Sequence, residues 1–121
     1  MTRYALLALV CLVAGCAQPE APRPAVVFFP ADSAALTLEG KQVVEKVALT
    51  ARETKPAKIF IEGHADGGTA RDATLANERA RTIMNELGRA GVATPIELSQ
   101  GAPPTAAAGV EAHKAVIRLV P

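Results

Sequence analysis

The sequence predicts a two-layer α/β domain, with two main helices on one face of a mixed four-stranded sheet in the order βαβαββ. The length of 121 residues suits one domain of ordinary size. Two long segments carry the apolar stripes of amphipathic helices, and four short apolar segments are typical of strands. Half of the residues are hydrophobic, but only three are Phe, one is Tyr and none is Trp. We therefore expect an aliphatic core.

Residues 1–15 have the features of a lipoprotein signal peptide. Arg3 supplies a positive charge, and residues 4–13 form a nearly unbroken apolar run. About ten apolar residues match a secretory signal and fall short of the ~20 that a membrane-spanning helix needs. The letters LVAGC at residues 12–16 then resemble the lipobox of bacterial lipoproteins, in which the cysteine is lipidated. An ordinary signal peptide that happens to contain cysteines is the alternative.

Lipid on Cys16 would attach the protein to a membrane without spanning it. Cys11 would leave with the signal peptide, so no thiol would remain for a disulfide or a metal site. Ala17 after the cysteine resembles the pattern that is sorted to the outer membrane of Gram-negative bacteria, with the domain facing the periplasm. Residues 16–25 contain three prolines and predict an extended tether. Ten residues reach at most ~35 Å, so the folded domain, residues 26–121, should lie near its anchor.

The first half of the domain predicts a strand, a helix and a second strand. Residues 26–29 form the first strand candidate, and residues 38–54 form a helix with Thr37 as its N-cap. Residues 58–62 form the second strand candidate, which runs into a glycine. This order suggests a βαβ unit with a right-handed crossover. The apolar stripe of the helix consists of Val43, Val44, Val47, Ala48 and Ala51.

A second helix follows the loop at residues 66–71, with Asp72 or Thr74 as its cap and Gly91 as its C-terminal stop. Its buried stripe is expected to contain Ala76, Ala80, Ile83, Met84 and Leu87.

Two more strands are expected to complete the sheet. Residues 95–100 alternate in polarity, and residues 114–120 do so as well. Residues 101–109 between them are rich in Ala and Pro and predict a loop.

Asp66 and Arg79 form the main candidate site. Asp66 lies just past a strand end, where open α/β sheets commonly place ligand groups. Arg79 follows Asp72 by two helical turns and lies at the edge of the buried stripe, where its guanidinium could bind a carboxylate. Asp66 would then meet an ammonium group, so the pair suits a zwitterionic amino-acid end. The alternatives are that Asp66 and Arg79 pair with each other, or that Asp66 caps the loop.

Three motifs resemble the OmpA-like peptidoglycan-binding domain. The resemblance covers residues 26–120, and with the lipobox the whole chain is similar to the small peptidoglycan-associated lipoproteins. The motifs are Phe29-x-x-Asp32-Ser33-x-x-Leu36, Ile61-Glu62-Gly63-His64-Ala65-Asp66 and Leu75-x-x-x-Arg79-Ala80.

The resemblance implies non-covalent binding of the peptidoglycan stem peptide. It places Asp66 and Arg79 at the free end of diaminopimelate, with His64, Gly67 and Asp72 beside them as further candidate binding residues. Such a protein would tether the outer membrane to the cell wall.

The chain departs from the family pattern at several positions. Asp72 stands where Asn is common, Glu78 replaces an Arg, and Ala112-His113-Lys114 replaces Asn-Arg-Arg. A carboxylate at Asp72 would repel a ligand carboxylate if it faced the pocket. These positions and the short tether leave a second hypothesis open. The domain would then be an interaction module for envelope proteins, such as a Tol-type complex or a secretion assembly, with weakened or lost peptidoglycan binding.

Other function classes find little support in the sequence. The mature chain would carry 12 basic and 12 acidic side chains without a basic run, which gives no footprint for nucleic acid. His64 and His113 are the two histidines, and they lack the spacing of a metal site. No Ser or Cys lies in a nucleophile elbow, so a periplasmic hydrolase is a weak third hypothesis. We expect no enzyme activity, metal or cofactor.

Overall fold

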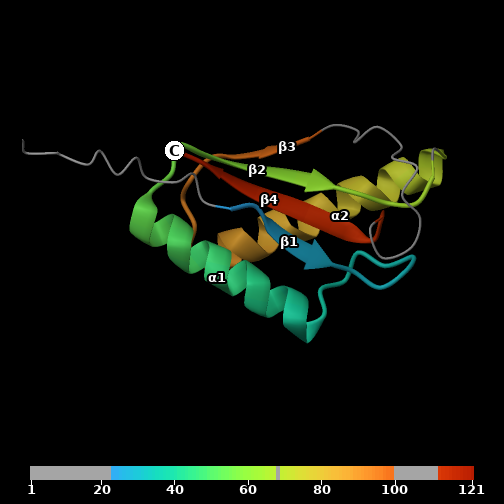
Figure 1. Ribbon diagram of the computed structural model, residues 1–121, viewed down its shortest axis with the longest axis horizontal. Helices are drawn as coiled ribbons and strands as arrows, with labels where there is room; N and C mark the ends of the chain where they lie inside the picture. Colours follow the sequence, from blue (N-terminus) through green and yellow to red (C-terminus); the bar gives the residue numbers. More distant parts are fainter. Residues whose placement is uncertain (1–22, 68, 100–111) are drawn as a thin grey trace, which may run out of the picture.

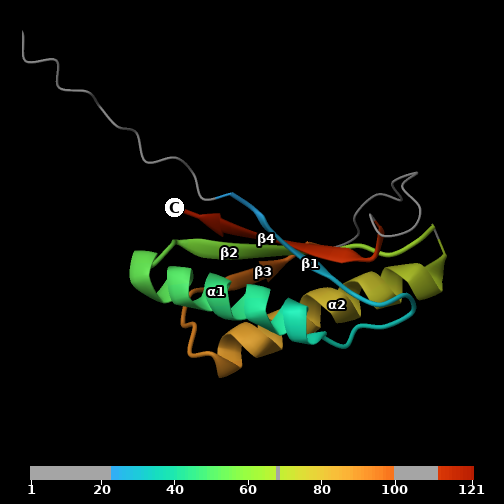
Figure 2. The same cartoon turned by 60° about the horizontal axis from the view of Figure 1, so that its bottom comes forward.

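The computed structural model describes residues 23–67, 69–99 and 112–121, and they form the predicted two-layer fold. Both helices cover one face of a four-stranded sheet (Figures 1 and 2). In the described part of the chain, no helix is long and apolar enough to cross a membrane. The expected signal peptide, the lipidation site at Cys16, most of the tether and the loop at 101–109 lie outside the described residues. The elements are β1 (Ala25–Phe28), α1 (Leu38–Thr54), β2 (Lys58–Gly63), α2 (Ala70–Arg89), β3 (Ile96–Leu98) and β4 (Lys114–Val120).

The last strand lies between the first two. The strand order is β1-β4-β2-β3, with β4 antiparallel to β1 and β2, and with β2 parallel to β3. In the expected βαβ unit of β1, α1 and β2, the two strands are therefore not neighbours, because β4 lies between them. By contrast, α2 connects β2 to β3, which are adjacent in the sheet. This order brings the ends of β1 and β2 to the same sheet edge as the start of β4. Segments that are far apart in the sequence meet at that edge.

The helix ends differ in one respect from the prediction. α1 is capped as expected by the Thr37 hydroxyl, which accepts the Gly40 N–H at 3.0 Å. α2 begins earlier than expected, because Thr69 is its N-cap and accepts the Asp72 N–H at 3.2 Å. The expected caps, Asp72 and Thr74, both lie inside the helix. The sequence S/T-x-x-D of a capping box was the signal for the earlier start.

The remaining boundaries are close to those expected. β3 is shorter than the predicted residues 95–100, and β4 has the predicted bounds. Gly91 has a φ of 83° after the end of α2, which suits a helix stop at glycine.

An aliphatic core fills the space between the sheet and the helices. Of the predicted stripe residues, Val43, Ala76 and Met84 are only half-buried because they lie at the margins of the core. The buried cluster consists of Val27, Phe29, Val44, Val47, Ala48, Ala51, Ile59, Ile61, Ala80, Ile83, Leu87, Ala115 and Ile117.

Gly63, at the end of β2, lets α2 approach the sheet closely. A Cβ atom at this position would lie 1.9 Å from the carbonyl oxygen of Ala76 on α2. A backbone carbonyl in a helix has little freedom to move away, so a side chain here would push the helix off the strand. Arg79 lies one turn after Ala76, so this approach places it beneath the strand ends.

We predict that Gly63→Ala lowers the free energy of unfolding by about 3 kcal/mol, because the added methyl group overpacks the contact between β2 and α2. Thermal and urea unfolding would measure the loss. Gly88→Ala on α2 is the matched control, since a Cβ there meets nothing within 4 Å. It should leave stability unchanged or raise it by up to ~1 kcal/mol. Equal stability of Gly63→Ala and the wild type would contradict this account.

Candidate ligand-binding site

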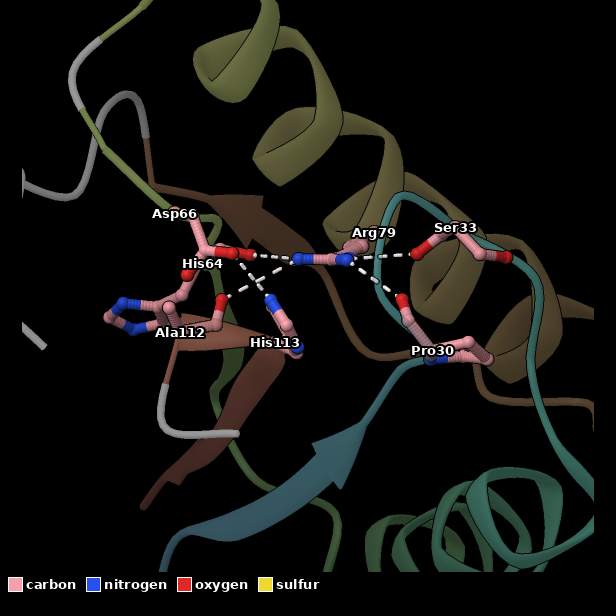
Figure 3. A network of polar contacts seen from close by, with 7 residues as sticks. All are labelled: Pro30, Ser33, His64, Asp66, Arg79, Ala112 and His113. Carbon is pink, nitrogen blue, oxygen red and sulfur yellow. Dashed lines mark hydrogen bonds and ion pairs between the residues drawn. The ribbon is translucent and has the colours of Figure 1, made fainter. Parts of the chain in front are cut away.

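The guanidinium of Arg79 contacts main-chain carbonyls from three segments, at the end of the sheet where β1 and β2 finish and β4 begins (Figure 3). Its Nε donates to the carbonyl oxygen of Ser33 at 2.9 Å, and Nη2 donates to that of Pro30 at 3.0 Å. Its Nη1 donates to the carbonyl oxygen of His64 at 2.8 Å and has a longer contact, 3.5 Å, to that of Ala112. The segments after β1, after β2 and before β4 are thereby joined through one side chain.

Arg79 is completely buried, with an exposed fraction of 0%. Its guanidinium carbon lies 5.5 Å from the centre of the Phe29 ring, within cation–π range. Burial lowers the pKa of Arg79, and the nearby carboxylates of Asp66 and Asp32 raise it. An arginine keeps its charge at neutral pH despite such a change, so a cation lies beneath the site. Arg79 was expected at the edge of the buried stripe, and the structure buries it completely, because the three segments fold over it.

Asp66 has the exposed side chain of the site. Its carboxylate is 53% exposed, and Oδ2 lies 2.6 Å from Nε2 of His113, which is 18% exposed. Asp66 acts on Arg79 through its charge, whereas its hydrogen bond goes to His113. The alternative in which Asp66 pairs directly with Arg79 is therefore not the observed arrangement. Figure 3 shows the carboxylate beside the buried cation and in contact with His113, which directly precedes β4.

Asp72 and Gly67 lie together at the start of α2. The Asp72 carboxylate accepts the Thr69 hydroxyl at 2.6 Å and the Thr69 N–H at 3.3 Å. Gly67 has a φ of 71°, and a Cβ there would lie 3.1 Å from Oδ2 of Asp72. Asp72 thus completes the capping box, and the charges that raise the pKa of Arg79 come from other carboxylates. Asp72 stabilises the loop end that carries Asp66.

The side chain of His64 points away from Arg79 in Figure 3. Its Nε2 lies 3.2 Å from Oε1 of Glu62. The main chain of His64 helps to hold the site together, since its carbonyl accepts a hydrogen bond from Arg79 and its N–H donates to the Lys114 carbonyl at 2.9 Å. His64 therefore contributes its backbone, and its imidazole is not brought to Asp66. Among the described residues, no three His, Cys, Asp or Glu side chains gather in a way that could hold a metal ion.

Sequence reasoning missed His113 as a member of the site. The signal was the pairing of strands, since His113 directly precedes β4 and β4 pairs with β2, the strand before Asp66. The carbonyl groups of Pro30, Ser33 and Ala112 were also missed. Main-chain ligands leave no trace in residue identity, so only the fold reveals them.

We predict that Arg79→Ala costs about 3–5 kcal/mol of stability, because it leaves part-buried and buried carbonyls without donors and removes the largest fully buried side chain. Arg79→Lys should recover only part of this loss, since an ammonium lacks the planar fork. Urea unfolding measures both. Arg81→Ala, an exposed arginine on the same helix, is the control and should change stability by less than ~0.5 kcal/mol. If Arg79→Ala were as stable as Arg81→Ala, the structural role of Arg79 would be refuted.

Comparison with known proteins agrees with this architecture. The OmpA family matches residues 28–114 of the chain. A search of curated proteins finds no significant match.

Solved structures show the same fold at low sequence identity. The peptidoglycan-associated lipoprotein from Burkholderia pseudomallei is 20% identical, with a TM-score of 0.64 over 78% of this chain and 87% of that one. The OmpA-like domain of FopA1 from Francisella tularensis is 13% identical, with a TM-score of 0.65 over 81% and 72%. The T6SS cell wall anchor from Pseudomonas aeruginosa is 22% identical, with a TM-score of 0.55 over 78% and 76%. The match to the family over most of the folded domain identifies this chain as a member of the OmpA family.

Proposed function

We propose that this domain binds peptidoglycan non-covalently through the free end of diaminopimelate in the stem peptide. The observation that carries the proposal is the exposed Asp66 carboxylate beside a buried arginine, at the edge where three segments of an OmpA-family domain meet. The free end of diaminopimelate carries an ammonium and a carboxylate. The site offers one charge of the opposite sign to each.

Asp66 binds the ammonium group in this proposal. Its carboxylate is accessible, and one of its oxygens is already oriented by His113. A charge-assisted hydrogen bond of this kind is worth about 1.5–3 kcal/mol, which is enough to select an ammonium over a neutral group.

Arg79 attracts the carboxylate of the ligand from beneath the surface. Direct contact requires that one of its carbonyl partners gives way. The contact to the Ala112 carbonyl is the longest of the four at 3.5 Å, so this is the one that we expect to open. Arg79 thus holds the empty site together and supplies the positive charge when the ligand binds.

Lipid on Cys16 supplies the membrane end of the tether. We propose that the protein lies in the outer membrane with its domain in the periplasm, so that reversible wall binding connects the membrane to peptidoglycan. The lipobox-like letters before Cys16 and the short Pro-rich stretch after it support this placement.

We predict that the full chain in detergent sediments with purified diaminopimelate-type peptidoglycan and that Asp66→Asn weakens binding at least tenfold, as loss of a charged contact implies. Asp66 is exposed, so the variant should keep its fold, which circular dichroism would verify. Glu45→Gln, which removes one exposed carboxylate from α1, is the matched control and should bind like the wild type.

Lysine-type peptidoglycan tests the second half of the ligand, because it offers the ammonium without the adjacent carboxylate. It should bind more weakly than the diaminopimelate type. Folded wild-type protein that stays in solution with both walls would overturn the proposal. The domain would then be an interaction module of an envelope complex, and the search would turn to protein partners.

We further predict that Cys16→Ser abolishes incorporation of labelled palmitate and releases the protein from the membrane fraction. Cys11→Ser is the control, because Cys11 lies within the expected signal peptide. It should be labelled like the wild type. Equal labelling of Cys16→Ser would refute the lipid anchor and leave the wall-binding proposal untouched.

A further inference from the structure

His113 contacts Asp66, whose carboxylate is exposed to a ligand. Its Nε2 lies 2.6 Å from Oδ2 of Asp66, and Figure 3 shows the imidazole beneath the carboxylate. Of the two partners, Asp66 is the exposed one and lies in the loop after β2, whereas His113 is largely covered and directly precedes β4. The contact therefore joins an exposed side chain in a loop to a largely covered side chain next to a strand.

The backbone around His113 is anchored from two sides. Its own carbonyl accepts the Phe29 N–H at 2.7 Å, which extends the pairing of β1 and β4. The carbonyl of the preceding residue, Ala112, is in contact with Arg79. A side chain on such a fixed backbone loses little further freedom when it binds a partner, so it can hold a carboxylate in one orientation before the ligand arrives.

The charge of the imidazole decides what this contact does to ligand binding. A neutral imidazole with its hydrogen on Nε2 donates to Asp66 and leaves the full negative charge of the carboxylate available. A protonated imidazole forms an ion pair with the same carboxylate and repels an incoming ammonium group. Imidazole is the side chain that changes its charge between pH 5 and 8. Binding of a cationic ligand group should therefore weaken in acid.

The charged groups around His113 come from several elements. Asp66 faces it from the loop after β2, and the guanidinium of Arg79 on α2 lies close by. Asp32, after β1, acts on Arg79 through its charge, and Lys114 is the next residue on β4. Among these groups, His113 carries the imidazole, the type of side chain that can gain a charge in mild acid.

We propose that His113 positions the Asp66 carboxylate for the ammonium group of the ligand and makes this binding weaken as the pH falls. The inference rests on the proposed function and adds to it a positioning residue and a pH dependence that come from this chain's own side chains. It assigns a role to His113 in the Ala112-His113-Lys114 motif at the start of the last strand.

The test compares the wild type, His113→Gln and His113→Ala as full chains in detergent, by sedimentation with diaminopimelate-type peptidoglycan at pH 7.5 and 5.5. Gln places a neutral N–H donor near the position of Nε2. It should bind within ~3-fold of the wild type at pH 7.5, and Ala should bind about tenfold more weakly, since it lacks one hydrogen bond to a charged group. The wild type should lose about tenfold on acidification, and His113→Gln should lose little.

His64→Gln controls for the other histidine and should keep the acid-induced loss of the wild type. Thermal unfolding at both pH values checks that each variant is folded. If His113→Ala fails to fold, the change in binding of His113→Gln between the two pH values still tests the inference. The same acid-induced loss in His113→Gln as in the wild type would overturn the inference. So would wild-type binding by folded His113→Ala at both pH values. Wild-type protein that does not sediment at pH 7.5 is a different result, because it overturns the proposed function itself.

Discussion

The bonds between the Arg79 guanidinium and main-chain carbonyls hold together the part of the molecule that the ligand would meet. Three segments converge there, and each brings at least one carbonyl group that is part-buried or buried. Such groups cost free energy unless a donor reaches them, and one planar side chain supplies donors to all three. Gly63 makes this possible, because its lack of a side chain lets α2 carry the arginine close to the strand ends.

In this arrangement the positive charge of the site is buried and the negative charge lies at the surface. The cation is fully covered and bound to the backbone, whereas the anion is exposed and is oriented by the histidine that directly precedes the last strand. A zwitterionic ligand would thus meet its ammonium partner first, at the surface. Its carboxylate would then compete with backbone carbonyls for the buried guanidinium. Because such exchange replaces existing bonds with new ones, we expect reversible binding, as a non-covalent tether requires.

Much of the fold follows from local patterns, since the helices, the strand order along the chain and the aliphatic core could all be read from apolar spacing. The sequence did not show that β4 lies between β1 and β2, because strand neighbours depend on the whole sheet. The same gap explains what was not predicted at the site. Asp66 was found from its place after a strand, but the complete burial of Arg79 and the contact of His113 were not, since both depend on which strand ends meet. A place for Asp72 near the ligand stays a prediction, and the structure shows that its carboxylate also caps α2.

The most direct test of the central claim is an NMR titration of the full chain in detergent with a stem peptide that ends in diaminopimelate. If the ligand binds between Asp66 and Arg79, amide shifts will concentrate in residues 31–33, 64–67 and 112–113, which belong to the segments that Arg79 connects. The Asp66→Asn variant should show these shifts only at higher peptide concentration. Shifts confined to the uncovered sheet face, or no shifts with folded protein, would contradict the account.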